Sequence, residues 1–222
     1  MTSPQYTITK PRKVVVPLND GLRWPGGKFL YLEKYDGAWV SGGLPFGGNL
    51  LLAERMKGLR GVYYVAHSVA AMAGQNVLHT PTRWRWAELQ RIAVDFGRSP
   101  DIHIELAASG SGGEFLEAVL AHGGEGVCAF NWDAPWGEML ACKRLETFPC
   151  MVTEFCGGNQ SARIALASNG QPCGGVALRG GKIELVRIGS LIKVEGYGLT
   201  TAGMIREPRL CRDTPRSWLI KY

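Results

Sequence analysis

The sequence lacks the residue spacings that mark a zinc site. Its six cysteines are scattered without a Cys-x-x-Cys pair, and its four histidines show no paired ligand spacing. We therefore predict that the protein holds no zinc and that its cysteines are reduced, small apolar residues. The six are Cys128, Cys142, Cys150, Cys156, Cys173 and Cys211.

Long hydrophobic runs and common nucleotide-binding loops are absent as well. Residues 1–20 contain only the short apolar run Val14–Val16, which cannot form the core of a signal peptide, and no later segment has transmembrane length. This predicts a soluble, cytoplasmic protein that does not interact with a membrane. The chain also has no Walker-type phosphate loop and no Rossmann glycine fingerprint, so any nucleotide would be bound in another way.

Glycine and positive charge are abundant. The 222 residues include 30 glycines, many in doublets, which predicts many turns and a strand-rich fold. The formal net charge of +6 is compatible with a polyanionic partner, although many ordinary enzymes share it. Arginines near the end of the sequence form a candidate phosphate-contacting strip, with a solvated charged tail as the alternative. They are Arg206, Arg209, Arg212 and Arg216.

Two segments carry helix signals. Thr80-Pro81 places a cap and a first-turn proline at the start of a helix that we expect to end at Gly97. Ser111 and Glu114 form a capping box, which predicts a second helix over residues 112–122. Short apolar runs separated by turn residues predict strands in the stretches 14–65, 101–107 and 126–130.

The pattern of apolar and turn-forming residues changes after Lys143. Residues 147–222 contain only short apolar runs separated by glycine, asparagine and proline, a pattern that suits a small closed barrel. We therefore predict an α+β fold with two domains. The first, residues 1–145, contains antiparallel sheets and the two helices, and the second, residues 146–222, is all-β.

A lysine stands where the first clear apolar strand ends. Phe29–Leu32 reads as a strand, and Lys34 follows it directly before the tight turn Asp36-Gly37. A lysine amine can act as a covalent nucleophile once it is neutral, and a glycine at such a turn lets a phosphate approach the backbone. An ordinary β-hairpin is the alternative, because Asp-Gly between apolar runs is a strong hairpin signal.

Three further charged residues border apolar strands. They are Glu54, Glu125 and Lys143. Each one alone could be a surface residue. Together with the first lysine they supply what nucleotidyl transfer needs: a lysine that attacks an α-phosphate, two carboxylates for Mg²⁺ and the ribose, and a second lysine that neutralises the phosphate.

These residues resemble the motifs of the covalent nucleotidyltransferases, which are the ATP-dependent DNA ligases with their RNA ligase and mRNA-capping relatives. Lys34-Tyr35-Asp36-Gly37 matches the family's nucleophile motif, Lys-x-Asp-Gly. Glu54 is similar to the glutamate of the third motif, Glu125-Gly126-Val127 to the fourth motif, and Lys143 to the second lysine of the fifth. Residues 189–208 resemble the end of a ligase oligonucleotide-binding (OB) barrel.

The resemblance implies a minimal, monomeric DNA ligase of the kind found in bacteria and viruses. It implies an adenylation domain over residues 1–145 and an OB-fold domain over residues 146–222. ATP would be the co-substrate, Mg²⁺ the metal ion and nicked duplex DNA the partner, as in DNA replication and repair. Lys34 and Lys143 would be catalytic, and Glu125 and Glu54 would bind the metal. The implied nucleotide-binding residues are Glu33, Asp36, Gly37, Glu54, Tyr63 and Tyr64.

The chain departs from the family's pattern at three places. Trp39 stands where DNA ligases carry an arginine, Ala141 replaces the first lysine of the fifth motif, and His67 replaces an aspartate. An RNA ligase tolerates the missing arginine and is one alternative. A degenerate, non-catalytic protein that binds nucleic-acid ends is another, and guanylate transfer by a capping enzyme is a weaker one.

Overall fold

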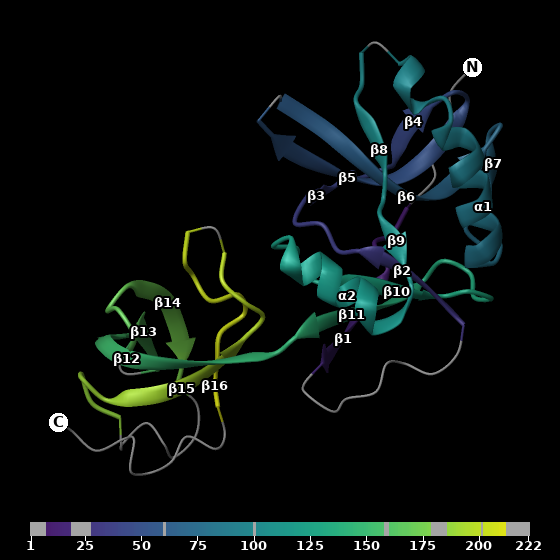
Figure 1. Ribbon diagram of the computed structural model, residues 1–222. Coiled ribbons are helices and arrows are strands. Elements are labelled where there is room, and N and C mark those ends of the chain that lie inside the picture. The colour runs from purple at the N-terminus through teal and green to yellow at the C-terminus, as the bar shows by residue number, and fades with distance from the viewer. Residues whose placement is uncertain are drawn as a thin grey trace. The chain divides into compact units, whose positions relative to one another are not determined.

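The computed structural model describes residues 8–18, 28–59, 61–99, 101–157, 160–178, 186–200 and 202–211 (Figure 1). The chain divides into two compact units. The first contains residues 1–16 and 22–143, and the second contains residues 17–21 and 144–222. The identity of each unit as an adenylation or an OB-fold domain stays a prediction.

The first unit contains two sheets. One sheet has the strand order β1-β11-β10-β2-β9, in which β10 is antiparallel to both β11 and β2. Its strands are β1 (Arg12–Leu18), β2 (Phe29–Glu33), β9 (Ser109–Gly110), β10 (Val127–Asn131) and β11 (Glu138–Arg144).

The second sheet is built around the long hairpin of β5 and β6. Strand β8 runs parallel to β6, whereas β3 and β4 pair antiparallel with β5. The strands are β3 (Ala38–Trp39), β4 (Leu44–Phe46), β5 (Asn49–Gly58), β6 (Gly61–Met72), β7 (Gln75–Asn76) and β8 (Ile104–Leu106). Because β2 and β3 belong to different sheets, residues 34–37 connect two sheets and form neither a hairpin nor the tight turn that Asp36-Gly37 predicted.

Two helices and a short 3₁₀ turn complete this unit. Helix α1 (Thr82–Ala93) begins directly after the predicted first-turn proline and ends before the 3₁₀ turn η1 (Phe96–Arg98). Pro81 is the N-cap residue and no side chain caps the helix, so the predicted Thr80 cap is wrong; the Thr80 hydroxyl donates to the carbonyl of Val77 instead. Helix α2 (Gly112–Ala121) follows Ser111, whose side chain makes no capping hydrogen bond. The predicted capping box is therefore wrong, since Gly112, with φ of +60°, turns the chain at the helix start. No helix among the described residues is long and apolar enough to cross a membrane.

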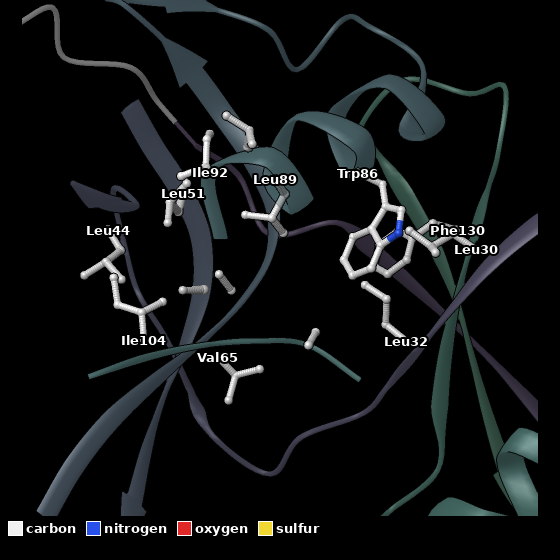
Figure 2. Packing of buried hydrophobic residues seen from close by; sticks show 14 of the residues in the cluster. Leu30, Leu32, Leu44, Leu51, Val65, Trp86, Leu89, Ile92, Ile104 and Phe130 are labelled. Carbon is white, nitrogen blue, oxygen red and sulfur yellow. The ribbon is translucent and has the colours of Figure 1, made fainter. Parts of the chain in front are cut away.

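The core of the first unit packs α1 against the second sheet, as the view of buried side chains in Figure 2 shows. Trp86 and Leu89 are buried on α1, three residues apart and therefore on one helical face. Leu51 and Val65 contribute from β5 and β6, and Phe130 contributes from the first sheet. The one-sided apolar spacing of α1 is thus explained by packing.

The second unit contains one antiparallel sheet in the order β14-β13-β12-β15-β16. Its strands are β12 (Glu146–Cys156), β13 (Ser161–Leu166), β14 (Pro172–Ala177), β15 (Leu191–Gly196) and β16 (Arg209–Leu210). The N–H of Ile205 donates to the carbonyl of Cys173 at 2.9 Å and so links the residues before β16 to the opposite edge strand. Closure of these strands into an OB-fold barrel stays a prediction.

Candidate active site

Strands β2 and β11 end, and the strand between them, β10, begins, at the same edge of the first sheet. Val127 of β10 lies opposite Glu33 of β2 and opposite Cys142 of β11. Because both neighbours run antiparallel to β10, the residues that follow β2, precede β10 and close β11 meet at one end of the sheet. These residues are Lys34, Glu125 and Lys143.

Glu125 joins the two lysines. Its Oε2 accepts a hydrogen bond from Nζ of Lys34, and its Oε1 accepts one from Nζ of Lys143. The side chain of Lys143 is only 1% exposed and that of Lys34 is 15% exposed. Burial by itself would raise the pKa of Glu125, but the hydrogen bonds from Lys143 and Lys34 outweigh this effect and lower the pKa. Glu125 is therefore an ionised carboxylate between two amines.

Glu54 reaches this site from the second sheet. Its Oε2 accepts a hydrogen bond from the backbone N–H of Gly37 at 3.2 Å. Burial raises the pKa of Glu54, and the Gly37 N–H and the charge of Lys34 act in the opposite direction. A Cβ at position 37 would meet Sδ of the flexible Met56 side chain and lie 3.1 Å from the Arg55 carbonyl oxygen, so a larger residue requires β5 and its side chains to give way slightly.

The turn before β10 depends on Gly126. Its carbonyl accepts a hydrogen bond from the N–H of Lys34 at 2.8 Å, and its φ is +144°. A Cβ here would lie well inside the 3.0 Å that real Cβ atoms keep, against the carbonyl oxygen of Cys142. Close backbone contact and left-handed φ together explain glycine at this position.

Gly126→Ala should therefore lower the free energy of unfolding by about 2 kcal/mol or more, because the added methyl forces a backbone shift at an unfavourable φ. Chemical denaturation measures this change. Gly137→Ala is the matched control, since a Cβ there meets no atom within 4 Å. Equal stability of the two variants would contradict the role assigned to Gly126.

A pocket beside Lys34 and Glu54 contains mostly apolar and aromatic side chains. Besides these two residues, it is lined by Lys10, Pro11, Leu32, Glu33, Tyr35, Trp39, His67, Cys128, Phe130, Trp136 and Met139. Strand alternation on β10 would have identified Phe130 from Cys128, two residues earlier. Trp136 lies in the loop between β10 and β11, and no pattern in the sequence of this loop predicts that Trp136 lines the pocket.

Some predicted nucleotide-binding residues lie elsewhere. Glu33 lines the pocket, whereas Asp36 is exposed and is not part of its lining. Tyr63 and Tyr64 do not line it either. The Tyr63 ring lies 5.8 Å from the ring of His103, and the N–H of Tyr64 donates to the His103 carbonyl. Their role in stacking on a base therefore finds no support in the pocket geometry.

The two carboxylates suit a magnesium ion only together with a nucleotide. Among the residues that the structure describes, no group of three or more His, Cys, Asp and Glu side chains could hold a metal by itself. Glu54 and Glu125 lie close enough for the charge of Glu125 to raise the pKa of Glu54. Mg²⁺ is commonly bound by one or two carboxylates plus waters and substrate phosphates, and this donor set fits that pattern.

Only half of the predicted arginine strip can be placed. Arg212 and Arg216 lie outside the described residues. Arg209 is exposed, with its guanidinium 6.0 Å from the centre of the Tyr197 ring and 3.7 Å from the carboxylate of Glu207. Arg206, which precedes Glu207 in the sequence, is half-buried. These two remain candidates for contacts to phosphate.

Comparison with solved structures identifies the class of fold. No family model matches the sequence, and no curated protein matches it either. A Lig E DNA ligase structure, from a study of DNA binding with a minimal scaffold, aligns with a TM-score of 0.67 at 14% identity, covering 94% of this chain and all of that chain. The structure called Pmar-Lig_Pre aligns with a TM-score of 0.61 at 13% identity, covering 85% of this chain and 64% of that one.

The chain thus has the fold of the polynucleotide ligases. More particularly, the chain has the fold of the minimal DNA ligases, since it matches the Lig E structure over that protein's whole length. The resemblance that the sequence motifs indicated is confirmed at the level of the fold.

Proposed function

We propose that the protein is an ATP-dependent polynucleotide ligase that seals nicks in duplex DNA as a monomer, through a covalent lysyl-AMP intermediate. The observation that carries this proposal is the group of Lys34, Glu125 and Lys143 beside a pocket. The fold of the minimal DNA ligases supports it. Residues 1–145 would form the adenylation domain, and residues 146–222 would form the OB-fold domain.

In the first step, Nζ of Lys34 attacks the α-phosphorus of ATP. A nitrogen–phosphorus bond forms, the bond from the α-phosphorus to the bridging oxygen breaks, and pyrophosphate leaves with the electron pair. The attack requires the neutral amine, so the Lys34 proton passes to solvent before the new bond forms. Glu54 and Glu125 would hold Mg²⁺, which supplies positive charge to the phosphates.

In the later steps, the AMP passes from Lys34 to the 5′-phosphate at a nick, and a 3′-hydroxyl then displaces AMP as the strands join. Lys143 contacts the transferred phosphate in this scheme, because its buried amine is a fixed positive charge beside Lys34.

Incubation with ATP and Mg²⁺ should increase the protein's mass by one AMP, with the adduct on Lys34. No adduct on the wild-type chain would contradict the proposal and favour a non-catalytic end-binding protein.

An RNA ligase is the second candidate, because Trp39 stands where DNA ligases carry arginine. Sealing assays on matched nicked duplexes, one with DNA and one with RNA strands, separate the two candidates. We expect the DNA nick to be sealed faster. Preference for the RNA nick would keep the covalent chemistry and change the substrate.

Binding of a nicked DNA duplex should weaken steeply as salt rises, because contacts to phosphates release counterions. Replacing Arg206 and Arg209 together by alanine should reduce affinity at low salt and lower the salt slope by about 1 to 2. Fluorescence anisotropy over a range of salt concentrations measures both. Arg91→Ala on α1, where Arg91 pairs with Glu88, is the control. An unchanged slope in the double variant would remove the strip from the DNA-binding surface.

A further inference from the structure

Three aromatic rings meet in the pocket beside Lys34. Trp39 comes from β3, His67 from β6 and Trp136 from the loop between β10 and β11. The rings of Trp39 and Trp136 have centroids 6.1 Å apart and planes inclined by 18°. The rings of His67 and Trp136 have centroids 6.1 Å apart and planes inclined by 15°. Trp136 is therefore nearly parallel to both other rings.

Trp136 is firmly held. Its backbone N–H donates to the carbonyl of Leu78 at 2.9 Å, and its indole Nε1 donates to the carbonyl of Thr9 at 3.0 Å. The guanidinium of Arg85 lies 5.9 Å from its ring centre and adds a cation–π contact. Arg85 is itself buried and hydrogen-bonded to Ser68. This ring is a fixed wall of the pocket.

Trp39 is held much less. It belongs to a strand of two residues, and no hydrogen bond to its indole exists among the residues that the structure describes. It lies directly opposite Glu54 in the pairing of β3 with β5, so both side chains project from the same face of that sheet. The pairing of β3 with β5 therefore directs the Trp39 ring into the pocket.

His67 brings an unused polar atom to this pocket. Its Nδ1 is inaccessible to solvent and has no hydrogen-bond partner among the described residues. Burial, and to a lesser extent the charge of Lys10, lowers the pKa of His67 to about 4, so the ring is neutral at pH 7. A buried polar atom normally has a partner. A ligand that fills the pocket can supply one.

The present space between the rings is small. The pocket has a volume of about 30 Å³, room for about two or three waters, whereas a cavity that holds one benzene ring measures about 150 Å³. A flat heterocycle is several times larger, so one wall must move to admit it. Trp39 is the wall with the fewest restraints.

We propose that the nucleobase of the nucleotide substrate stacks on Trp136, that Trp39 moves aside to admit it, and that Nδ1 of His67 bonds to its edge. The class of ligand is a purine nucleotide with its phosphates toward Lys34. This inference rests on the proposed function and assigns the base to residues other than Tyr63 and Tyr64, which lie outside the pocket.

Binding of AMP tests the proposal, because AMP carries the base but cannot label Lys34. Titration with AMP should quench the tryptophan fluorescence of the wild-type protein, and Trp39→Phe should lose a large part of the quenching. His67→Ala should raise the Kd for AMP at least tenfold. His67→Phe keeps a flat ring without the nitrogen. Its Kd for AMP should therefore lie between that of the wild type and that of His67→Ala.

Two controls make the result decisive. Trp84→Phe changes a tryptophan that is 39% exposed on α1 and does not line the pocket, and it should leave both the quenching and the Kd unchanged. Tyr63→Ala should also leave the Kd unchanged. Thermal unfolding shows whether each variant is folded. Trp136→Phe retains a ring at the fixed wall, and its Kd should rise if the variant is folded.

The failure of this inference differs from failure of the proposed function. Wild-type protein that takes up AMP from ATP on Lys34, together with an unchanged Kd in the two His67 variants, would overturn only the base site. A raised Kd in Tyr63→Ala with no effect at His67 would move the site to Tyr63. A wild-type protein that binds AMP but never becomes labelled would overturn the proposed function and leave the aromatic site standing.

Discussion

Lys34→Ala abolishes the transfer of label from ATP, labelled at its α-phosphate, to the protein. The alanine has no nucleophile. Two other amines lie near the site: Lys143 is only 1% exposed and bound by Glu125, and Lys10 lines the pocket and is exposed. We expect neither amine to replace the lost bond to phosphorus. We expect label to fall to background, measured on denaturing gels after incubation with Mg²⁺.

Two further variants isolate the chemistry from the charge. Lys34→Arg retains a positive charge near Glu125 but has no neutral amine at working pH, so it should also stay unlabelled. Lys28→Ala removes an exposed lysine just before β2 and should be labelled like the wild type. Label that persists on Lys34→Ala would place the nucleophile elsewhere.

Glu125→Gln should be the most destabilising change in the site. It leaves the buried Lys143 without the carboxylate that now neutralises it, and breaking a buried ion pair costs about 3–5 kcal/mol. Chemical denaturation should show this loss, and the variant should take up little label because its metal contact is also gone. Glu88→Gln is the matched control on an exposed pair with Arg91, where about 0–1 kcal/mol is expected.

The difference between wild type and Glu125→Gln should depend on pH. The pKa of Glu125 is lowered from 4.5 in the folded chain, so the unfolded state binds its proton first as pH falls. The stabilisation is fully present above pH 4.5 and is lost as pH falls through the lowered value. The difference in unfolding free energy between the wild type and Glu125→Gln should therefore be constant near neutral pH and should become smaller in acid. A difference that widened in acid would contradict the ion-pair assignment.

Local features of the fold could be predicted because they depend on neighbours in sequence. The start of α1 lies one residue after Pro81, although Thr80 does not cap it, and the end of β2 before Lys34 follows from the apolar run Phe29–Leu32. The capping box at Ser111 failed for a local reason as well, because the left-handed φ of Gly112 is not encoded by the capping pattern. The sequence also indicated the charged residues of the site by their positions at strand ends.

The aromatic side of the pocket was not predictable in the same way. Tyr63 and Tyr64 were expected near the base, but His67 of the same strand lines the pocket. The pairing of β5 with β6 shifts register twice, once between Leu52 and Ala53. Each irregularity changes which side chains face the pocket, because strand side chains alternate with a period of two. Such shifts arise from pairing between strands and leave no pattern in one strand's sequence.

The sequence by itself determined which charged side chains are available to the candidate site: a lysine before Asp36-Gly37, two glutamates and a second lysine. Only the tertiary structure decided that they form one site. Lys34 and Glu125 are 91 residues apart, and they meet because β10 pairs between β2 and β11. The structure also decided that Trp39 and Trp136 face each other across the pocket. Both outcomes depend on long-range pairing and packing, since local propensity does not specify which strands become neighbours.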